Sequence, residues 1–171
     1  MEQVAGFLRW FHIMAGVMWI GILYYFNFVQ GQAIAAANKD QAGSAAPITK
    51  YVAPRALFWF RWAALATWLF GLGLLGPNVL NAFTFQNGFA GIGMGAWLGT
   101  IMFLNVWGII WQHQKKVLNL GPYAANPASD EVKANSRVIA AFASRVNVLL
   151  SIPMFFFMVS GSSAHMGLFS F

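Results

Sequence analysis

The chain has 171 residues, of which 59% are hydrophobic, 17% aromatic and only 8% charged. A soluble domain carries about 25% charged residues, so this composition predicts an integral membrane protein whose surface faces lipid. The sequence has no cysteine, which excludes disulfides, iron–sulfur clusters and covalently attached haem. The net charge of +6 does not indicate nucleic-acid binding, because the basic residues cluster in two loops beside apolar segments.

Four apolar segments are each long enough to cross the hydrocarbon core, which takes about 20 residues. They cover about residues 7–29, 56–75, 89–111 and 146–169. The first is too long for the apolar region of a signal peptide and lacks a small-residue cleavage site, so we expect it to stay as a helix. The chain is therefore expected to form one all-α domain (1–171), an integral membrane four-helix bundle.

Basic residues predict the orientation of this bundle. They gather in the first and third loops: Lys39, Lys50, Arg55, Lys115, Lys116, Lys133, Arg137 and Arg145. The second loop, 76–88, carries no charge. The positive-inside rule then places loops one and three in the cytoplasm and both termini on the periplasmic side of a bacterial inner (cytoplasmic) membrane, as a multi-pass protein. Arg9 is the one residue that opposes this orientation.

The fourth span has two possible registers, because hydropathy alone lets it begin near Val138. We expect it to begin after Arg145, a residue that favours the cytoplasmic edge, which brings His165 about 30 Å further along the helix, near the outer surface. Pro153 is expected to kink this helix. Alanines of the first loop are expected to form a short helix on the membrane surface, and Ser129 to cap a short cytoplasmic helix ahead of the fourth span.

Two histidines are expected at one depth near the periplasmic rim, His12 in the first span and His165 in the last. A metal-binding side chain in hydrocarbon is a functional-site hypothesis by default, and two imidazoles at one level predict axial ligation of haem iron. Arg9, Gly16 and Trp19 share a helical face with His12. Arg9 suits a haem propionate, and Gly16 leaves room for a flat macrocycle.

Two alternatives stay open for these histidines. Each imidazole can instead hydrogen-bond a neighbouring carbonyl or reach the interface. Copper is the alternative metal, with the sulfur atoms of Met158, Met166 and Met14 or Met18 as soft ligands, although no Met-rich or His-rich cluster supports it. Haem with two imidazole ligands is six-coordinate, which favours electron transfer over oxygen chemistry.

A second polar group is expected near the cytoplasmic face: Asn27, Arg61, Asn105, Gln112, His113, Gln114, Arg145 and Asn147. Arg61 lies inside the second span without an acidic neighbour, so it needs carbonyls, amides, lipid phosphate or an anionic ligand as its partner. His113 is a candidate for a quinone head group or a second haem, but no second histidine lies at its depth, and a hydrogen bond in the interface is the preferred interpretation. Asn105 and Asn147 are expected to join helices.

Glycine and tryptophan spacings predict packing and depth. Gly91, Gly95 and Gly99 form a stripe along the third span, where another helix of this chain or of a second subunit can approach closely. Five tryptophans lie near span ends, as in an aromatic belt: Trp10, Trp59, Trp62, Trp107 and Trp111.

These features resemble a known family. Its motifs occur in order over nearly the whole chain, at 12–21 (HIMAGVMWIG), 58–62 (FWFRW), 67–71 (TWLFG), 105–116 (NVWGIIWQHQKK) and 147–165. They are similar to the membrane domain of the urate hydroxylase family, also called the urate oxidase N-terminal domain. The resemblance implies that His12 and His165 match family histidines in the corresponding helices, and that the chain has a quinone- or cytochrome-linked redox role.

The chain also departs from that family. Full-length urate enzymes carry further helices and a cytochrome c domain with a Cys-x-x-Cys-His motif, whereas this sequence has no cysteine. The family's second span has a histidine where this chain has Phe58 and an acidic residue where it has Ala63 or Ala64, and a His-Gly-Gly stretch of the first loop has no counterpart. A four-helix membrane cytochrome b is compatible with these losses, and urate oxidation is less so.

Three functions follow from the sequence. The favoured one is a b-type haem protein that transfers electrons within the membrane, with a cytochrome c or a quinone as partner. The second is an oxidoreductase that uses the haem to oxidise a small purine such as urate. The third is a non-redox accessory subunit of a larger respiratory or photosynthetic complex. Membrane lipid is an expected partner in all three, and homo-oligomers stay open.

Overall fold

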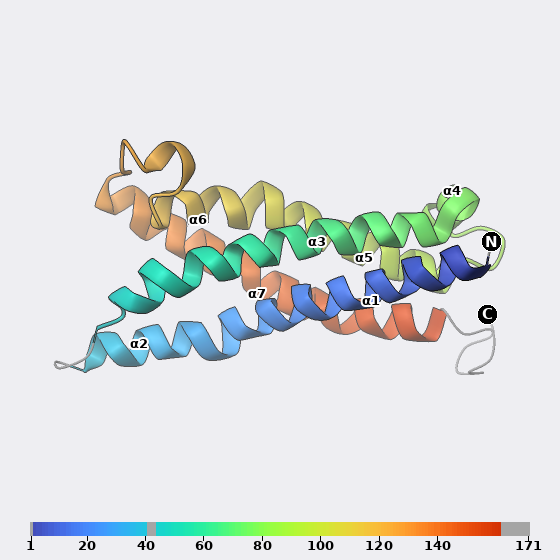
Figure 1. Cartoon of the computed structure of the whole chain (residues 1–171), viewed down its shortest axis with the longest axis horizontal. Coiled ribbons are helices and arrows are strands. Elements are labelled where there is room, and N and C mark those ends of the chain that lie inside the picture. The colour runs from blue at the N-terminus through green and yellow to red at the C-terminus, as the bar shows by residue number, and fades with distance from the viewer. Residues whose placement is uncertain (1, 41–43, 162–171) are drawn as a thin grey trace.

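The computed structural model describes residues 2–40 and 44–161, and these fold into helices joined by short turns (Figure 1). In chain order the helices are α1 (Glu2–Tyr24), η1 (Tyr25–Gln30), α2 (Gly31–Lys39), η2 (Ile48–Val52), α3 (Ala53–Leu75), η3 (Gly76–Asn78), α4 (Val79–Phe83), α5 (Ala90–Asn105), η4 (Val106–Ile110), α6 (Trp111–Val117), η5 (Gly121–Tyr123) and α7 (Asp130–Gly161). The segments η1, η2 and η4 are π-helical and join their neighbours without a break.

Four of the resulting helical runs are long and apolar enough to cross a membrane: Glu2–Lys39, Ile48–Phe83, Ala90–Tyr123 and Asp130–Ser160. They confirm the all-α class and provide four long apolar helices, as a membrane four-helix bundle requires. The first run has 38 residues, which is about 57 Å of helix and nearly twice the thickness of the hydrocarbon core. The bundle therefore extends beyond the lipid. α1 begins and α7 ends at the same end of it (Figure 1).

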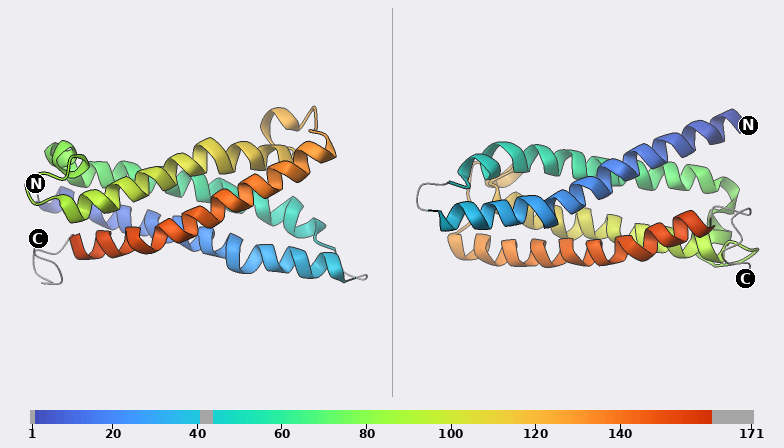
Figure 2. Two further views of the ribbon diagram at one scale, coloured as in Figure 1. Left: turned by 180° about the vertical axis from the view of Figure 1, so that it is seen from behind. Right: turned by 90° about the horizontal axis from the view of Figure 1, so that it is seen from below.

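Two expectations about the connecting segments are wrong. α2 continues along the direction of α1 and does not turn across the bundle (Figure 1), because the π-helical η1 keeps the backbone helical between them. α7 is a single helix of 32 residues, so no separate short helix precedes the fourth span. Its expected cap is present, since the Ser129 hydroxyl accepts the backbone N–H of Val132 at 3.4 Å. α7 bends in its second half, the half that contains Pro153 (Figure 2).

The register of the fourth span stays a prediction. Exposed apolar side chains lie along α7 from Val132, which is 43% exposed, to Val159. This stretch is about 40 Å long, which exceeds the thickness of the hydrocarbon core and is compatible with both registers. Arg145 lies exposed among these side chains.

Large apolar side chains lie on the outside of this bundle as well as in its core, and a few polar side chains of the described residues are buried between the helices. The buried polar residues are Thr67, Ser136, Asn147 and Ser151, while Val17, Leu149 and Ile152 are each more than 60% exposed. Lipid tails are as apolar as leucine, so a membrane bundle gains little by burying such side chains and is held together by packing and interhelical hydrogen bonds.

The four runs pack chiefly as two pairs, α1 against α3 and α5 against α7. Gly95 lies at the second interface, where an added Cβ would come within 3.1 Å of the Met158 Cγ atom. The glycine stripe therefore serves packing within the chain at Gly95, whereas a Cβ at Gly99 would meet nothing within 4 Å. At the far end of α3, Gly76 adopts a φ of +50°, a conformation that favours glycine and ends the helix.

Candidate functional site

His12 projects from α1 against one turn of α3. Its Nδ1 atom lies 2.8 Å from the backbone oxygen of Thr67. Gly71, one turn further along α3, lets the imidazole approach, since a Cβ there would be 3.0 Å from the His12 Cε1 atom and 3.2 Å from Nδ1. The Thr67 hydroxyl is not part of this contact because it donates to the Ala63 oxygen at 2.7 Å. The ring is thus held by backbone and by the lack of a side chain at position 71.

This contact determines which nitrogen of His12 carries the proton. A carbonyl oxygen only accepts, so in the neutral ring Nδ1–H donates to Thr67 and Nε2 keeps its lone pair. Metal-binding histidines show the same arrangement, in which a carbonyl holds one ring nitrogen and orients the other toward the metal. Nε2 is therefore the ring nitrogen of His12 that keeps its lone pair.

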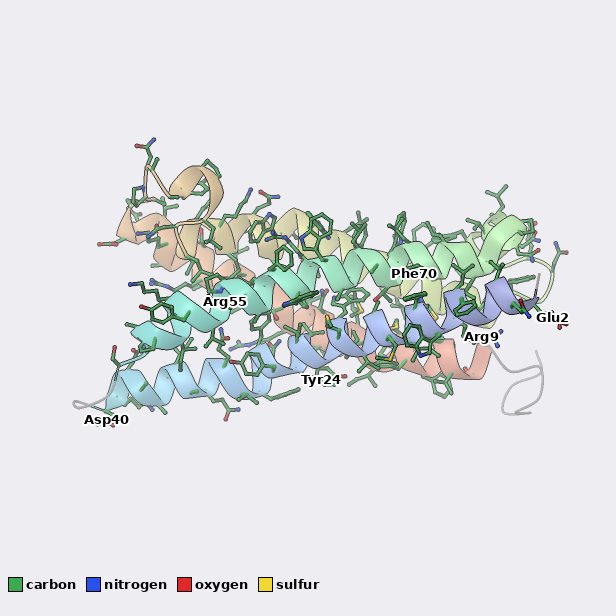
Figure 3. All side chains as sticks on the ribbon, viewed as in Figure 1. Glu2, Arg9, Tyr24, Asp40, Arg55 and Phe70 are labelled. Atoms are coloured by element: carbon green, nitrogen blue, oxygen red, sulfur yellow. The ribbon has the colours of Figure 1, made fainter. Side chains whose placement is uncertain are left out.

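The other residues expected around His12 have different surroundings. Gly16 lies beside α3, where an added Cβ would be 3.7 Å from the Thr67 Cγ2 atom. Trp19 is 2% exposed, and its indole N–H finds no acceptor within residues 2–40 and 44–161. Arg9 is exposed on α1, close to Glu2 at the N-terminal end of the bundle (Figure 3). Gly16 and Trp19 thus face the bundle interior with His12, and Arg9 faces outward.

The second expected ligand, His165, lies outside the described residues, so the predicted pair of histidines is not seen. The level of His12 on α7 can nevertheless be located, because α1 and α7 run in opposite directions (Figure 2). The hydroxyls of Tyr24 and Ser151 are 2.9 Å apart, and the Asn27 amide donates to Ser144 at 2.8 Å. Counting from these two bonds along both helices sets His12 level with the C-terminal end of α7.

The methionines considered for copper do not surround His12. Met14 and Met18 are 50% and 43% exposed on α1, and Met158 packs against Gly95. Within the described part of the chain, no group of three or more histidine, cysteine or acidic side chains is close enough to hold a metal ion. At this end of the bundle the described residues therefore offer the His12 imidazole alone and no complete protein-only metal site.

The polar group expected at the other end divides into separate contacts. The predicted bond between Asn105 and Asn147 is present, with the Asn105 amide donating to the Asn147 oxygen at 2.7 Å and to the Ala143 carbonyl at 2.8 Å. Asn147 is fully buried and donates in turn to the Met102 carbonyl at 3.1 Å. This network joins α5 to α7 and pairs both amide nitrogens, while the buried Asn105 Oδ1 atom has no partner among the described residues.

Arg61, His113 and Arg145 do not form one site. The His113 Nδ1 atom lies 3.2 Å from the Ser136 hydroxyl, so this imidazole links α6 to α7. The Arg61 guanidinium lies over the Trp111 ring, with its Cζ atom 3.8 Å from the ring centroid. Arg145 is exposed on α7. The structure therefore favours a hydrogen-bonding role for His113 over a ligand-binding one. It also shows that the aromatic neighbour of Arg61 is Trp111, which the sequence did not indicate.

Sequence reasoning missed the two residues that position His12. Thr67 and Gly71 lie four residues apart on α3, a spacing that places both on one helical face. Small residues on one face of a membrane helix signal close approach of another helix, but nothing in the sequence shows that the neighbour is α1.

Comparison with known proteins found no matching family model, no matching curated protein and no matching solved structure. The function is therefore argued from the geometry of the site.

Proposed function

We propose that this chain is a b-type membrane cytochrome, with haem held where α1 begins and α7 ends. His12 is one axial ligand and His165 is the other. The observation that carries the proposal is the hydrogen bond from His12 Nδ1 to the Thr67 carbonyl, because it leaves Nε2 free to bind iron.

The residues around His12 fit such a group. Gly71 leaves the space in which the imidazole is fixed, and Gly16 adds no side chain between His12 and the bundle interior. The unpartnered N–H of Trp19 is a buried donor on the same face, and a buried donor without an acceptor costs about 1–3 kcal/mol unless a ligand or water satisfies it. Arg9, exposed near the start of α1, is available to a propionate.

The level of His12 supports His165 as the second ligand. The two hydrogen bonds between α1 and α7 set His12 beside the C-terminal end of α7, and His165 follows that end by four residues.

Haem supplies one-electron transfer when it is bound, and the chain's own residues set the conditions for it. His12, fixed by its contact with α3, would hold the iron together with His165. The exposed apolar side chains of the bundle face lipid and exclude water from the interior, and burial of this kind tunes a haem's potential. The haem so held would supply one-electron exchange with a carrier such as a cytochrome c or a quinone.

The proposed setting is a bacterial inner membrane, with the start of α1 and the end of α7 on the periplasmic side. Basic residues support it, because they gather at the end of the bundle opposite to His12. The resemblance to the membrane domain of urate hydroxylases favours the same two histidines. No feature of the described residues favours purine oxidation itself, so electron transfer is the function that the geometry supports best.

A reduced-minus-oxidised absorption spectrum of the purified protein, expressed with sufficient haem supply, tests this proposal. We expect the α and β bands of six-coordinate haem b in the parent protein, their loss in His12→Ala and in His165→Ala, and their retention in His113→Ala. The third variant is the matched control, since it also removes a half-buried imidazole that bonds a neighbouring helix. A colourless parent protein, or equal loss of haem in all three variants, would refute the assignment.

A further inference from the structure

Arg61 is a cation on α3 that the proposed haem site does not use. Its guanidinium lies between two aromatic rings, with Cζ 3.8 Å from the centroid of Trp111 and 5.4 Å from that of Phe58. The Arg61 carbonyl also accepts the indole N–H of Trp107 at 3.2 Å. Backbone and side chain are therefore held against the η4–α6 segment, and the guanidinium has a defined position.

The guanidinium has no anionic partner in the described ranges. A guanidinium has five N–H donors, yet that of Arg61 makes no hydrogen bond or ion pair with any residue in 2–40 or 44–161. The acidic residues lie elsewhere: Glu2 at the start of α1, Asp40 after α2, and Asp130 and Glu131 at the start of α7. An aromatic face attracts a cation but cannot accept five hydrogen bonds, so this group needs an external acceptor.

A second cation lies against the same indole ring. The Lys115 ammonium is 5.7 Å from the Trp111 centroid, and Lys115 comes from α6 whereas Arg61 comes from α3. Two like charges beside one ring repel each other unless an anion lies nearby. Both cations therefore lie within 5.7 Å of the centroid of one ring.

Tryptophans place this pair at the level of the lipid headgroups. Trp59 and Trp62 are 55% and 44% exposed beside Arg61, and Trp62 packs edge-to-face on Trp107 at 5.5 Å between centroids. Exposed tryptophans of membrane proteins concentrate at the interface, where the rings lie among headgroups. The anion available at that level of a bilayer is a lipid phosphate, and the planar fork of arginine matches phosphate geometry.

We propose that Arg61, Lys115 and Trp111 bind the headgroup phosphate of an anionic phospholipid, at the membrane boundary opposite to His12. Arg61 donates hydrogen bonds to phosphate oxygens, Lys115 adds the second positive charge, and Trp111 holds both cations in place. The second charge makes the site select a net anionic lipid over a zwitterionic one. This inference is independent of the haem, because none of its residues contacts His12.

Native mass spectrometry of the full chain tests the site after incubation in detergent with equal amounts of phosphatidylglycerol and phosphatidylcholine. We expect the parent protein to retain phosphatidylglycerol in preference, by about fivefold for each cation near the headgroup. Arg61→Gln and Lys115→Gln should each lower that preference several-fold. Arg145→Gln is the matched control, since it removes one exposed positive charge that lies over no aromatic ring among the described contacts, and it should leave the preference unchanged.

Equal retention of the two lipids by the parent protein would overturn the proposal. An equal loss of the phosphatidylglycerol preference in Arg145→Gln would also overturn it, because it would show diffuse attraction to the basic end of the bundle. Displacement of the lipid by inorganic phosphate would overturn it as well, because it would show a site for the free anion. If Arg61→Gln does not fold, Lys115→Gln and the conservative Arg61→Lys replace it. Arg61→Lys keeps the charge but loses the fork, so it should weaken retention without abolishing it.

Discussion

Replacing Gly71 with alanine perturbs the position of His12 while the histidine itself stays unchanged. The new Cβ would lie 3.0 Å from the His12 Cε1 atom, whereas carbon atoms pack at about 3.5–4.0 Å. The imidazole must therefore retreat from α3 by at least about 0.5 Å. Because Thr67 is one turn from Gly71 on the same helix, this movement lengthens the 2.8 Å bond to the Thr67 carbonyl beyond good hydrogen-bonding geometry.

The magnitude follows from these contacts. Overpacking a close interface costs about 1–3 kcal/mol of stability. Loss of the hydrogen bond to Thr67 accounts for about 0.5–1.5 kcal/mol of this cost. Alanine returns up to about 1 kcal/mol through its higher helix propensity. Gly73→Ala on the same helix is the matched control, because its Cβ would meet only the Leu8 methyl groups at 3.5 and 3.6 Å, an ordinary contact.

We expect Gly71→Ala to be about 1–3 kcal/mol less stable than Gly73→Ala, since both gain the same propensity and only the first displaces His12. Unfolding in detergent, followed by far-UV circular dichroism, measures this difference. Haem content per protein, read from the absorption spectrum, should fall in Gly71→Ala alone. If the two variants match in both stability and haem content, the position assigned to His12 against α3 is wrong. A stability difference at equal haem content would keep the packing and refute the ligand role.

Two further predictions concern the interface between α5 and α7. Replacing the buried Asn147 with leucine should destabilise the protein by about 0.6–1.7 kcal/mol, the range for interhelical hydrogen bonds in membranes. A double-mutant cycle with Asn105→Leu should show coupling between the two substitutions. Strict additivity of their effects on stability would count against the network. Gly95→Ala should cost about 1–3 kcal/mol because its Cβ meets Met158 at 3.1 Å, whereas Gly99→Ala should be neutral or slightly stabilising; equal thermal midpoints for the two alanine variants would contradict the close approach.

The polar core shows how far a sequence can predict an interaction in a membrane. Asn105 and Asn147 were expected to join helices because an amide in hydrocarbon must find a partner, and they bond each other. Arg61 was expected to need a partner for the same reason, but not Trp111 in particular. The need belongs to the residue type and is visible in the sequence, while the choice of partner depends on the rotation of each helix about its axis.

The sequence likewise predicts one part of the helix boundaries and not the other. Apolar length predicts where a chain crosses the lipid because the hydrocarbon core has a set thickness and every backbone group inside it must be paired within the helix. It does not predict how far a helix continues in water. α2 extends α1, and the first part of α7 continues into the fourth span. Apolar length did not predict either extension.

For this protein, composition and apolar periods by themselves determined an all-helical chain with four long apolar segments, two basic loops and one loop, 76–88, without charge. They also singled out His12 as a polar group that hydrocarbon does not tolerate without a role. Only the tertiary structure decided that α3 holds its imidazole, through the Thr67 carbonyl and the bare backbone of Gly71. Every residue has a backbone carbonyl, and a glycine does not indicate which side chain packs against it. A contact made by such groups is therefore seen only when the two helices are placed side by side.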